Sequence, residues 1–188
     1  MNDALGVLEF SSIPSGYRTY NRIIKDVEVD VLRDIIIAPG KLVIMFGGSY
    51  GAVSHALEWA IGSSAEGILD YSLIGNVNAD LAGFLAGGVS DGPGGGAAYT
   101  DIGVIEADTV AAGIEKANSV LHGTPVGLTA INYSVEMHGK CLIVIGGSIS
   151  AVSAALEAAG SGELVSNVEP AVLRSIIGKT EATGESNG

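Results

Sequence analysis

The feature of this sequence that most restricts its fold is an internal repeat. The stretch GKLVIMFGGSYGAVSHALEWA, which starts at Gly40, returns as GKCLIVIGGSISAVSAALEAA, which starts at Gly139. Upstream of it, the segment LGVLE, which starts at Leu5, likewise aligns with IGVIE, which starts at Ile102. A duplication that covers this much of the chain predicts two copies of one domain.

Composition and glycine content suggest where these domains begin and end. We expect a first domain at residues 1–87 and a second at residues 100–178. Residues 88–99 are rich in glycine, which is typical of a linker, and residues 179–188 form a polar tail that we expect to be flexible. With 47% hydrophobic and 16% charged residues, the 188-residue chain favours packed domains over disorder.

The apolar pattern within each copy predicts the order β-α-β-β-α-β-α. In the first copy LGVLEF reads as a strand, and a helix follows that Ser12 caps and Pro14 begins. Residues 27–37 alternate between apolar and charged, which predicts a half-buried strand, and a tight turn joins it to the next strand. We expect the core face of the first helix to consist of Tyr17, Tyr20, Ile23 and Ile24.

Two strands joined by a tight turn, between two helices, indicate a split β-α-β arrangement. The predicted fold class is therefore α/β, of the α+β kind: two tandem ferredoxin-like domains, each an antiparallel sheet with helices on one side. Such a sheet leaves edges and one face to be covered, often by association.

The glycine-rich turn FGGSYGAV, starting at Phe46, joins a strand to a helix and raises the possibility of phosphate binding. Its spacing is not that of a dinucleotide site, and the second copy has Ser150 in place of the last glycine. A helix start capped by Ser49 is the favoured interpretation.

Candidate reactive residues form no recognisable catalytic set. The three histidines share no metal-site spacing, and His55 and Trp59 are expected to pack along one helix face. Cys141 lies in an apolar strand and is expected to be buried rather than nucleophilic. Glu9 and Glu106 occupy equivalent strand positions, and the sequence leaves open whether they meet.

Charge and hydropathy exclude several classes of partner. The formal charge of −12 argues against nucleic acid. No apolar run approaches the roughly 18 residues of a membrane span, and the N-terminus does not resemble a signal peptide. A single cysteine rules out an internal disulfide. We expect a soluble, cytoplasmic protein.

The repeated segments ALGVLE and PGKLVIMFGGSYGAV, with their second copies DIGVIE and HGKCLIVIGGSISAV, resemble the bacterial microcompartment (BMC) shell domain. The resemblance covers residues 4–177 and is strongest to the tandem-domain, trimeric, PduT-like class. It implies a non-enzymatic structural protein: a homotrimer that imitates a hexamer and tiles with other shell proteins, around a central pore for small metabolites.

The resemblance also assigns residues to the pore, which the turn between the second and third strands of each copy would line. A cluster-carrying group of relatives has a cysteine before Pro-Gly, where this chain has Ala38, so no iron–sulfur cluster or other cofactor is expected. The pore-lining residues implied by the resemblance are Ile37, Ala38, Pro39, Gly40, Glu136, Met137, His138 and Gly139.

Edge contacts in the family use a lysine at the end of the first helix and an arginine after the fourth strand. These positions correspond to Lys25 and His122, and to Asn76 and Asn167. Two alternatives stay open beside the shell protein: an electron-transfer variant with a metal or cluster, and a small-molecule-binding regulatory trimer on the same fold. Iron analysis and a ligand screen by thermal shift would separate them.

Overall fold

A computed structural model describes residues 3–64, 67–87, 99–133 and 137–181. It contains two repeats with the predicted order of elements, which confirms the expected fold class. The expected linker, residues 88–99, and the end of the tail lie almost entirely outside the described residues. The elements of the first repeat are β1 (Ala4–Phe10), α1 (Ile13–Asp26), β2 (Asp30–Ile37), β3 (Lys41–Gly48), α2 (Tyr50–Ser64), β4 (Ile68–Gly75) and α3 (Ala79–Leu85).

The second repeat follows the same order, and its last helix continues beyond residue 178. In both repeats the four strands form an antiparallel sheet with equivalent orders, β2-β3-β1-β4 and β6-β7-β5-β8. The elements of the second repeat are β5 (Ile102–Ala107), α4 (Val110–Gly123), β6 (Gly127–Asn132), β7 (Cys141–Gly146), α5 (Ile149–Ala159), β8 (Glu163–Val165) and α6 (Pro170–Glu181).

Serine or threonine hydroxyls cap the first turns of α1, α2, α4 and α5. Ser12 accepts a hydrogen bond from the Ser15 amide at the start of α1, and Thr109 accepts one from the Ala112 amide at the start of α4. Ser49 does the same for α2, so the glycine-rich turn is a capped helix start, as predicted. These caps satisfy amides that the first helical turn leaves without partners.

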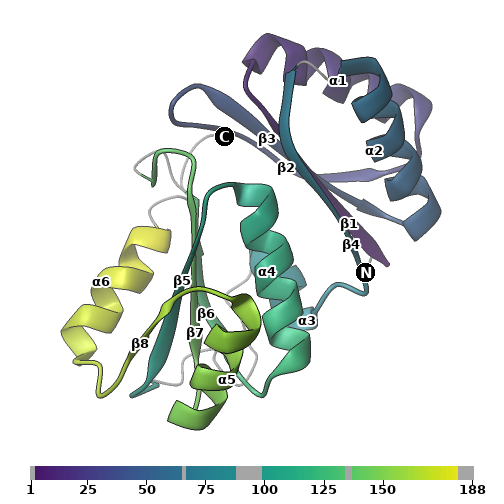
Figure 1. Ribbon diagram of the computed structural model, residues 1–188. Coiled ribbons are helices and arrows are strands. Elements are labelled where there is room, and N and C mark those ends of the chain that lie inside the picture. The colour runs from purple at the N-terminus through teal and green to yellow at the C-terminus, as the bar shows by residue number, and fades with distance from the viewer. Residues whose placement is uncertain (1–2, 65–66, 88–98, 134–136, 182–188) are drawn as a thin grey trace.

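The first sheet is covered on both faces, but by helices from different repeats. Helices α1 and α2 pack on one face and bury Leu8, Phe10 and Phe46 with them. The opposite face, with Leu5 and Val7, packs against α4 of the second repeat, so that one hydrophobic core runs through both repeats. Figure 1 shows α4 between the two sheets, with α1 and α2 beyond the first sheet.

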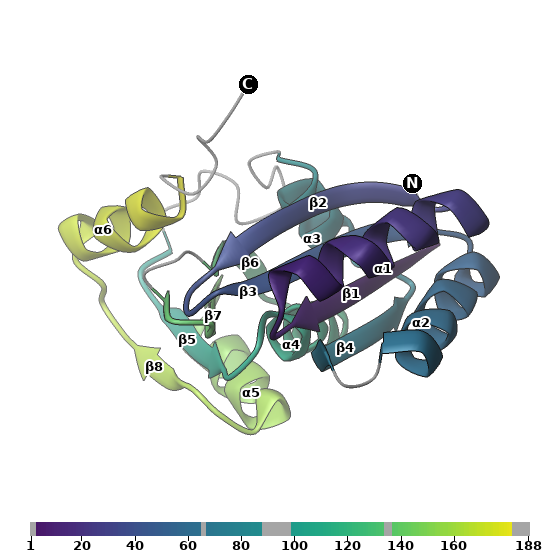
Figure 2. The ribbon, with the colours of Figure 1, turned by 90° about the horizontal axis from the view of Figure 1, so that it is seen from above.

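The second sheet has α4 and α5 on one face, whereas α6 packs on the other face against β6. This helix lies at the opposite edge of the sheet from β8, because β6 and β8 are the two edge strands. Figure 2 shows α1 and α6 in separate parts of the molecule. The hydrophobic cluster under α6 also includes Ile102 and Val104 of β5, so the exposed part of this face lies at Glu106 and along β8.

Three local predictions were wrong. Tyr17 and Ile24 do not face the core of the first repeat, because their side chains are 40% and 49% exposed. Strand β2 begins at Asp30 rather than at residue 27, since Val27 ends helix α1 as its cap. His55 is exposed, and Trp59 stacks on the guanidinium of Arg22, at 5.9 Å from the ring centroid, rather than on His55.

Candidate assembly surfaces and pore turns

Both apolar packing and side-chain hydrogen bonds join the two repeats. Helix α4 lies on the face formed by β1 and β4. The hydroxyl of Ser72, on β4, lies 3.1 Å from the carbonyl of Ala111 and 2.8 Å from the carboxylate of Glu115. Thr109, the cap of α4, donates to the carboxylate of Asp70 on β4. These bonds fix the helix along the strand.

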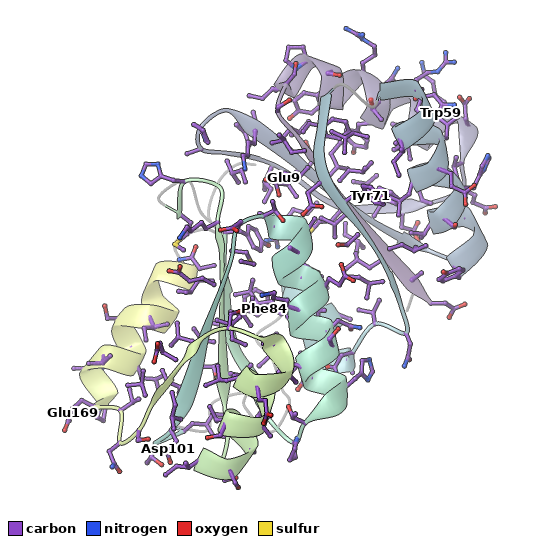
Figure 3. The ribbon with its side chains drawn as sticks, viewed as in Figure 1. Glu9, Trp59, Tyr71, Phe84, Asp101 and Glu169 are labelled. Carbon is purple, nitrogen blue, oxygen red and sulfur yellow. The ribbon has the colours of Figure 1, made fainter. Side chains whose placement is uncertain are left out.

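Glu9 anchors the beginning of α4. Its side chain is fully buried, and Oε1 accepts a hydrogen bond from Lys41 Nζ at 2.8 Å. Oε2 accepts one from the amide of Val110, also at 2.8 Å. A buried carboxylate needs such partners, and the first turn of a helix is a favourable place for negative charge. Figure 3 shows Glu9 between the first sheet and the start of α4.

Glu106 is the counterpart of Glu9 in the second repeat, and its surroundings differ. It also pairs with the equivalent lysine, Lys140, at 3.1 Å, but the two side chains are 60% and 49% exposed. The structure therefore holds Glu9 and Glu106 in separate ion pairs with separate lysines. The difference in burial follows from α4, which covers Glu9, whereas no helix among the described residues takes the equivalent place over Glu106.

The same asymmetry extends along the whole strand face. Four residues of the first repeat lie under or beside α4, and their counterparts in the second repeat are more exposed; for example, Ile74 is 4% exposed and Val165 is 39% exposed. We call this set the open β5–β8 face. It consists of Val104, Glu106, Glu163 and Val165, the counterparts of Val7, Glu9, Ser72 and Ile74.

A matching asymmetry separates the two equivalent helices. On α4 the residues that meet the first sheet and its following loop are buried, whereas their counterparts on α1 are exposed to solvent. We call the exposed set the α1 stripe. It consists of Pro14, Tyr17, Asn21 and Ile24, the counterparts of Ala111, Ile114, Asn118 and Leu121.

The structure brings together two of the four predicted edge residues. His122 Nε2, in the last turn of α4, lies 2.7 Å from the carbonyl oxygen of Asn76, which follows β4. Next to this contact, Asn118 accepts a hydrogen bond from the amide of Asn78 at 2.8 Å. Asn76 has a φ of 52°, a left-handed conformation that asparagine tolerates better than most residues.

The other two edge residues, Lys25 and Asn167, are exposed and belong to different repeats. Lys25 occupies the last turn of α1, as His122 does in α4. Asn167 follows β8 with the same φ of 52°, and its amide donates to the carboxylate of Asp101 at 3.2 Å. The single chain therefore contains the His122–Asn76 contact and both halves of an equivalent Lys25–Asn167 contact.

The two predicted pore turns lie side by side. A Cβ atom at Gly139 would be 3.1 Å from the carbonyl oxygen of Ala38 and 2.8 Å from Lys41 Nζ. In the first turn the amide of Gly40 donates to the carbonyl of Ile37, and both glycines have a positive φ that favours glycine.

The remaining predicted pore residues differ in exposure. Ile37 is buried, whereas Pro39, Gly40 and His138 are exposed. Met137 is half-buried and accepts a hydrogen bond from the amide of Lys140, and Glu136 lies outside the described residues.

A polar contact that the sequence did not suggest crosses between the sheets near these turns. Arg33 Nη1, on β2, donates to the hydroxyl of Tyr133 at 2.9 Å. Burial raises the pKa of Tyr133, and the nearby Arg33 partly opposes this rise. The two residues are 100 positions apart and are not counterparts in the repeat, so no sequence pattern links them.

The chemistry of Cys141 is that of an interior thiol, as predicted. It is fully buried, and a Cβ at Gly113 of α4 would be 2.4 Å from its Cβ. Burial, and to a lesser degree the charge of Glu9, raises the pKa of Cys141 to about 12. Among the described residues no three His, Cys, Asp or Glu side chains form a group suited to a metal ion. Those residues also include no helix long and apolar enough to cross a bilayer.

This geometry defines a class of protein: a tandem of like domains in which one contact is satisfied within the chain and its counterpart is left exposed. Comparison with known protein families identifies the family of the two domains. The BMC domain model matches twice, over residues 4–77 and 101–174. The chain therefore belongs to the BMC domain family, as a shell protein with two BMC domains.

Individual relatives agree with this assignment. The chain is 29% identical to the bacterial microcompartment shell protein PduT of Citrobacter freundii, over 94% of this chain and 92% of the relative. A microcompartment protein from Desulfitobacterium hafniense has the same fold, with a TM-score of 0.76 at 20% identity, over 92% of this chain and 98% of that one. The fused permuted hexameric shell protein MSM0275 of the RMM microcompartment has a TM-score of 0.58 at 16% identity, over 83% and 81%.

Proposed function

We propose that three copies of this chain close into a ring of six domains, in which first and second repeats alternate. The observation that carries the proposal is the unequal burial of equivalent surfaces: α4 and the β1–β4 face cover each other, whereas the α1 stripe and the open β5–β8 face are exposed. Placing the α1 stripe of one copy on the open face of the next repeats the contact already present within each chain. Head-to-tail contacts of this kind form rings when the rotation closes.

The number of copies follows from the expected imitation of a hexamer, since three chains supply six domains. The exposed surfaces also carry apolar side chains: Tyr17, Ile24 and Val165 are exposed large apolar residues of the described part of the chain. Apolar side chains gathered at one place on a surface are typical of contacts between subunits.

The ring would serve as a structural tile in the shell of a microcompartment in the cytoplasm, beside other shell proteins, and would have no catalytic role. The proximity of Ala38 and Gly139 supports a shared pore at the centre, through which small metabolites pass. Each chain would contribute one turn from each repeat to that pore. Cys141 does not support the alternative role in electron transfer, because its thiol is buried and is not exposed at either pore turn.

Native mass spectrometry together with light scattering tests the ring directly. We expect a single species of three chains at micromolar concentration. A stable monomer or a dimer under these conditions would contradict the proposal. A shell role is tested separately by electron microscopy of the protein co-expressed with other shell proteins, where we expect it in the shell layer.

A further inference from the structure

We infer that Arg18 of one copy forms an ion pair with Glu163 of the next copy at each contact between chains, and that this pair makes the open β5–β8 face selective for first repeats. The inference rests on the proposed ring and concerns residues that within a single chain lie on different repeats. It replaces, between chains, the hydrogen bond that Ser72 and Glu115 make within the chain.

The register of the strands places Glu163 where the first repeat has Ser72. Ser72 pairs with Val7 across the β1–β4 ladder, and Glu163 pairs with Val104 across the β5–β8 ladder. Val7 and Val104 are the same position of the repeated segment GV(L/I)E. In an antiparallel sheet, directly opposed residues point to the same face. Glu163 therefore belongs to the open face, as Ser72 belongs to the face that α4 covers.

The helices place Arg18 where the second repeat has Glu115. Ser12 caps α1 and Thr109 caps α4, and Arg18 and Glu115 each follow their cap by six residues. Within the chain, Glu115 Oε2 lies 2.8 Å from the hydroxyl of Ser72. When the contact is repeated between chains, the guanidinium of Arg18 takes the place of the Glu115 carboxylate, and the Glu163 carboxylate takes the place of the Ser72 hydroxyl.

The chemistry of the two positions is complementary. Both side chains are exposed, and neither makes an ion pair with any other residue in the described part of the chain. An arginine can bind a carboxylate through two parallel hydrogen bonds, which adds geometric precision to the attraction. The chain has 9 Lys and Arg against 21 Asp and Glu, so identical copies repel one another at long range. A cation at the point of contact opposes this repulsion.

The pair also distinguishes right from wrong neighbours. If the open face took the α4 surface of another copy before that copy's own first sheet covered it, Glu163 would face Glu115, and two carboxylates would oppose each other. If it meets α1, Glu163 faces Arg18. Like charges across an interface disfavour the wrong partner more than opposite charges strengthen the right one. The order of repeats around the ring is thereby fixed by charge as well as by shape.

Charge reversal tests the pair. We expect Arg18→Glu and Glu163→Arg, each alone, to raise the protein concentration at which half of the trimer dissociates by about tenfold or more, because each chain leaving the ring breaks two such contacts. The double variant, Arg18→Glu with Glu163→Arg, should restore assembly to within about threefold of the parent, since coupled charges compensate in a double-mutant cycle. The readout is native mass spectrometry over a dilution series.

Two matched controls separate this pair from a general effect of charge. Arg22→Glu makes the same change one turn further along α1, where the side chain faces Trp59 and Asp26 instead of the stripe. Glu157→Arg makes the opposite change on the exposed surface of α5. Both should leave the trimer intact, and circular dichroism should show that all variants are folded.

The possible results separate failure of the proposed ring from failure of the ion pair. If the parent protein is not a trimer, the proposed ring itself is wrong. If the parent is a trimer and the single reversals assemble as it does, or if the double variant assembles no better than the single ones, the ring stands and the Arg18–Glu163 pair is wrong.

Discussion

At the scale of single residues, the protein shows how the same side chain acquires different properties in two copies of one domain. Glu9 and Glu106 have the same strand position and the same type of lysine partner. Only Glu9 is buried, because α4 lies over it and adds the amide of Val110 as a second partner. The local sequence around the two residues is nearly identical, so no pattern in either segment could have predicted which of them is buried.

The thiol of Cys141 gives a prediction at this scale. Its pKa is raised from 9.0 to about 12, so the folded state disfavours the thiolate relative to the unfolded state. The corresponding stability is present below pH 9 and is lost as the pH rises toward 12. Urea unfolding of the parent should therefore lose more free energy over this range than unfolding of Cys141→Ala, which lacks the thiol.

Labelling with a thiol reagent provides an independent check of the same residue. Native protein at pH 8 should react slowly, and protein unfolded in urea should react at the rate of a free cysteine. Rapid labelling of the folded protein, or equal pH dependence of the parent and Cys141→Ala, would show that the thiol is accessible.

At the scale of elements, α1 and α4 are equivalent helices with opposite surroundings. The sequence predicted both helices, their caps and the strand order, because these depend on local patterns: a hydroxyl before an apolar period of three to four residues, and turns at Gly and Pro. It did not predict that Tyr17 and Ile24 are exposed in the single chain. Periodicity shows that a face is apolar, and it does not show whether the covering surface belongs to the same repeat or to another chain.

Counterpart positions on these helices give a paired prediction. Leu121→Ser should lower the free energy of unfolding by about 3 kcal/mol, because Leu121 is only 8% exposed where α4 ends within the chain. Ile24→Ser, at the equivalent position of α1, should leave the folding of the chain nearly unchanged and weaken the trimer, since Ile24 is 49% exposed. Chemical denaturation measures the first effect and mass spectrometry the second.

The two substitutions control for each other, because they remove similar apolar groups from the same turn of equivalent helices. If Ile24→Ser assembles as the parent does at every dilution, the α1 stripe is not part of the contact between chains.

At the scale of the whole molecule, duplication lets one domain contact exist in two versions. Within the chain the contact is permanent and has become an extension of the hydrophobic core. Between chains, on the proposed arrangement, it is reversible and selected by charge. A single-domain protein would have to use the same residues for every contact around its ring. With two fused domains, the contact within the chain can be optimised for burial, and the contact between chains can be optimised for selection of the correct partner.

The last prediction concerns Lys25, which we expect to act at the edges between rings. Its counterpart His122 contacts the carbonyl of Asn76, so on the proposed ring Lys25, which is exposed at the end of α1, would lie near Asn167 of the next chain. An exposed lysine contributes little to folding, and one rim contact contributes about 1 kcal/mol or less to the ring. Lys25→Ala should therefore keep the trimer and its thermal stability.

The same substitution should impair the packing of rings into sheets, because sheet contacts are small and each ring repeats the loss three times. Negative-stain electron microscopy should show extended layers for the parent and isolated rings or small patches for Lys25→Ala. Arg22→Ala, which removes a cation from the same helix on the side that faces Trp59, is the matched control and should form layers. Normal layers from Lys25→Ala would exclude this residue from the edge, and a large loss of thermal stability would place it within the folded unit instead.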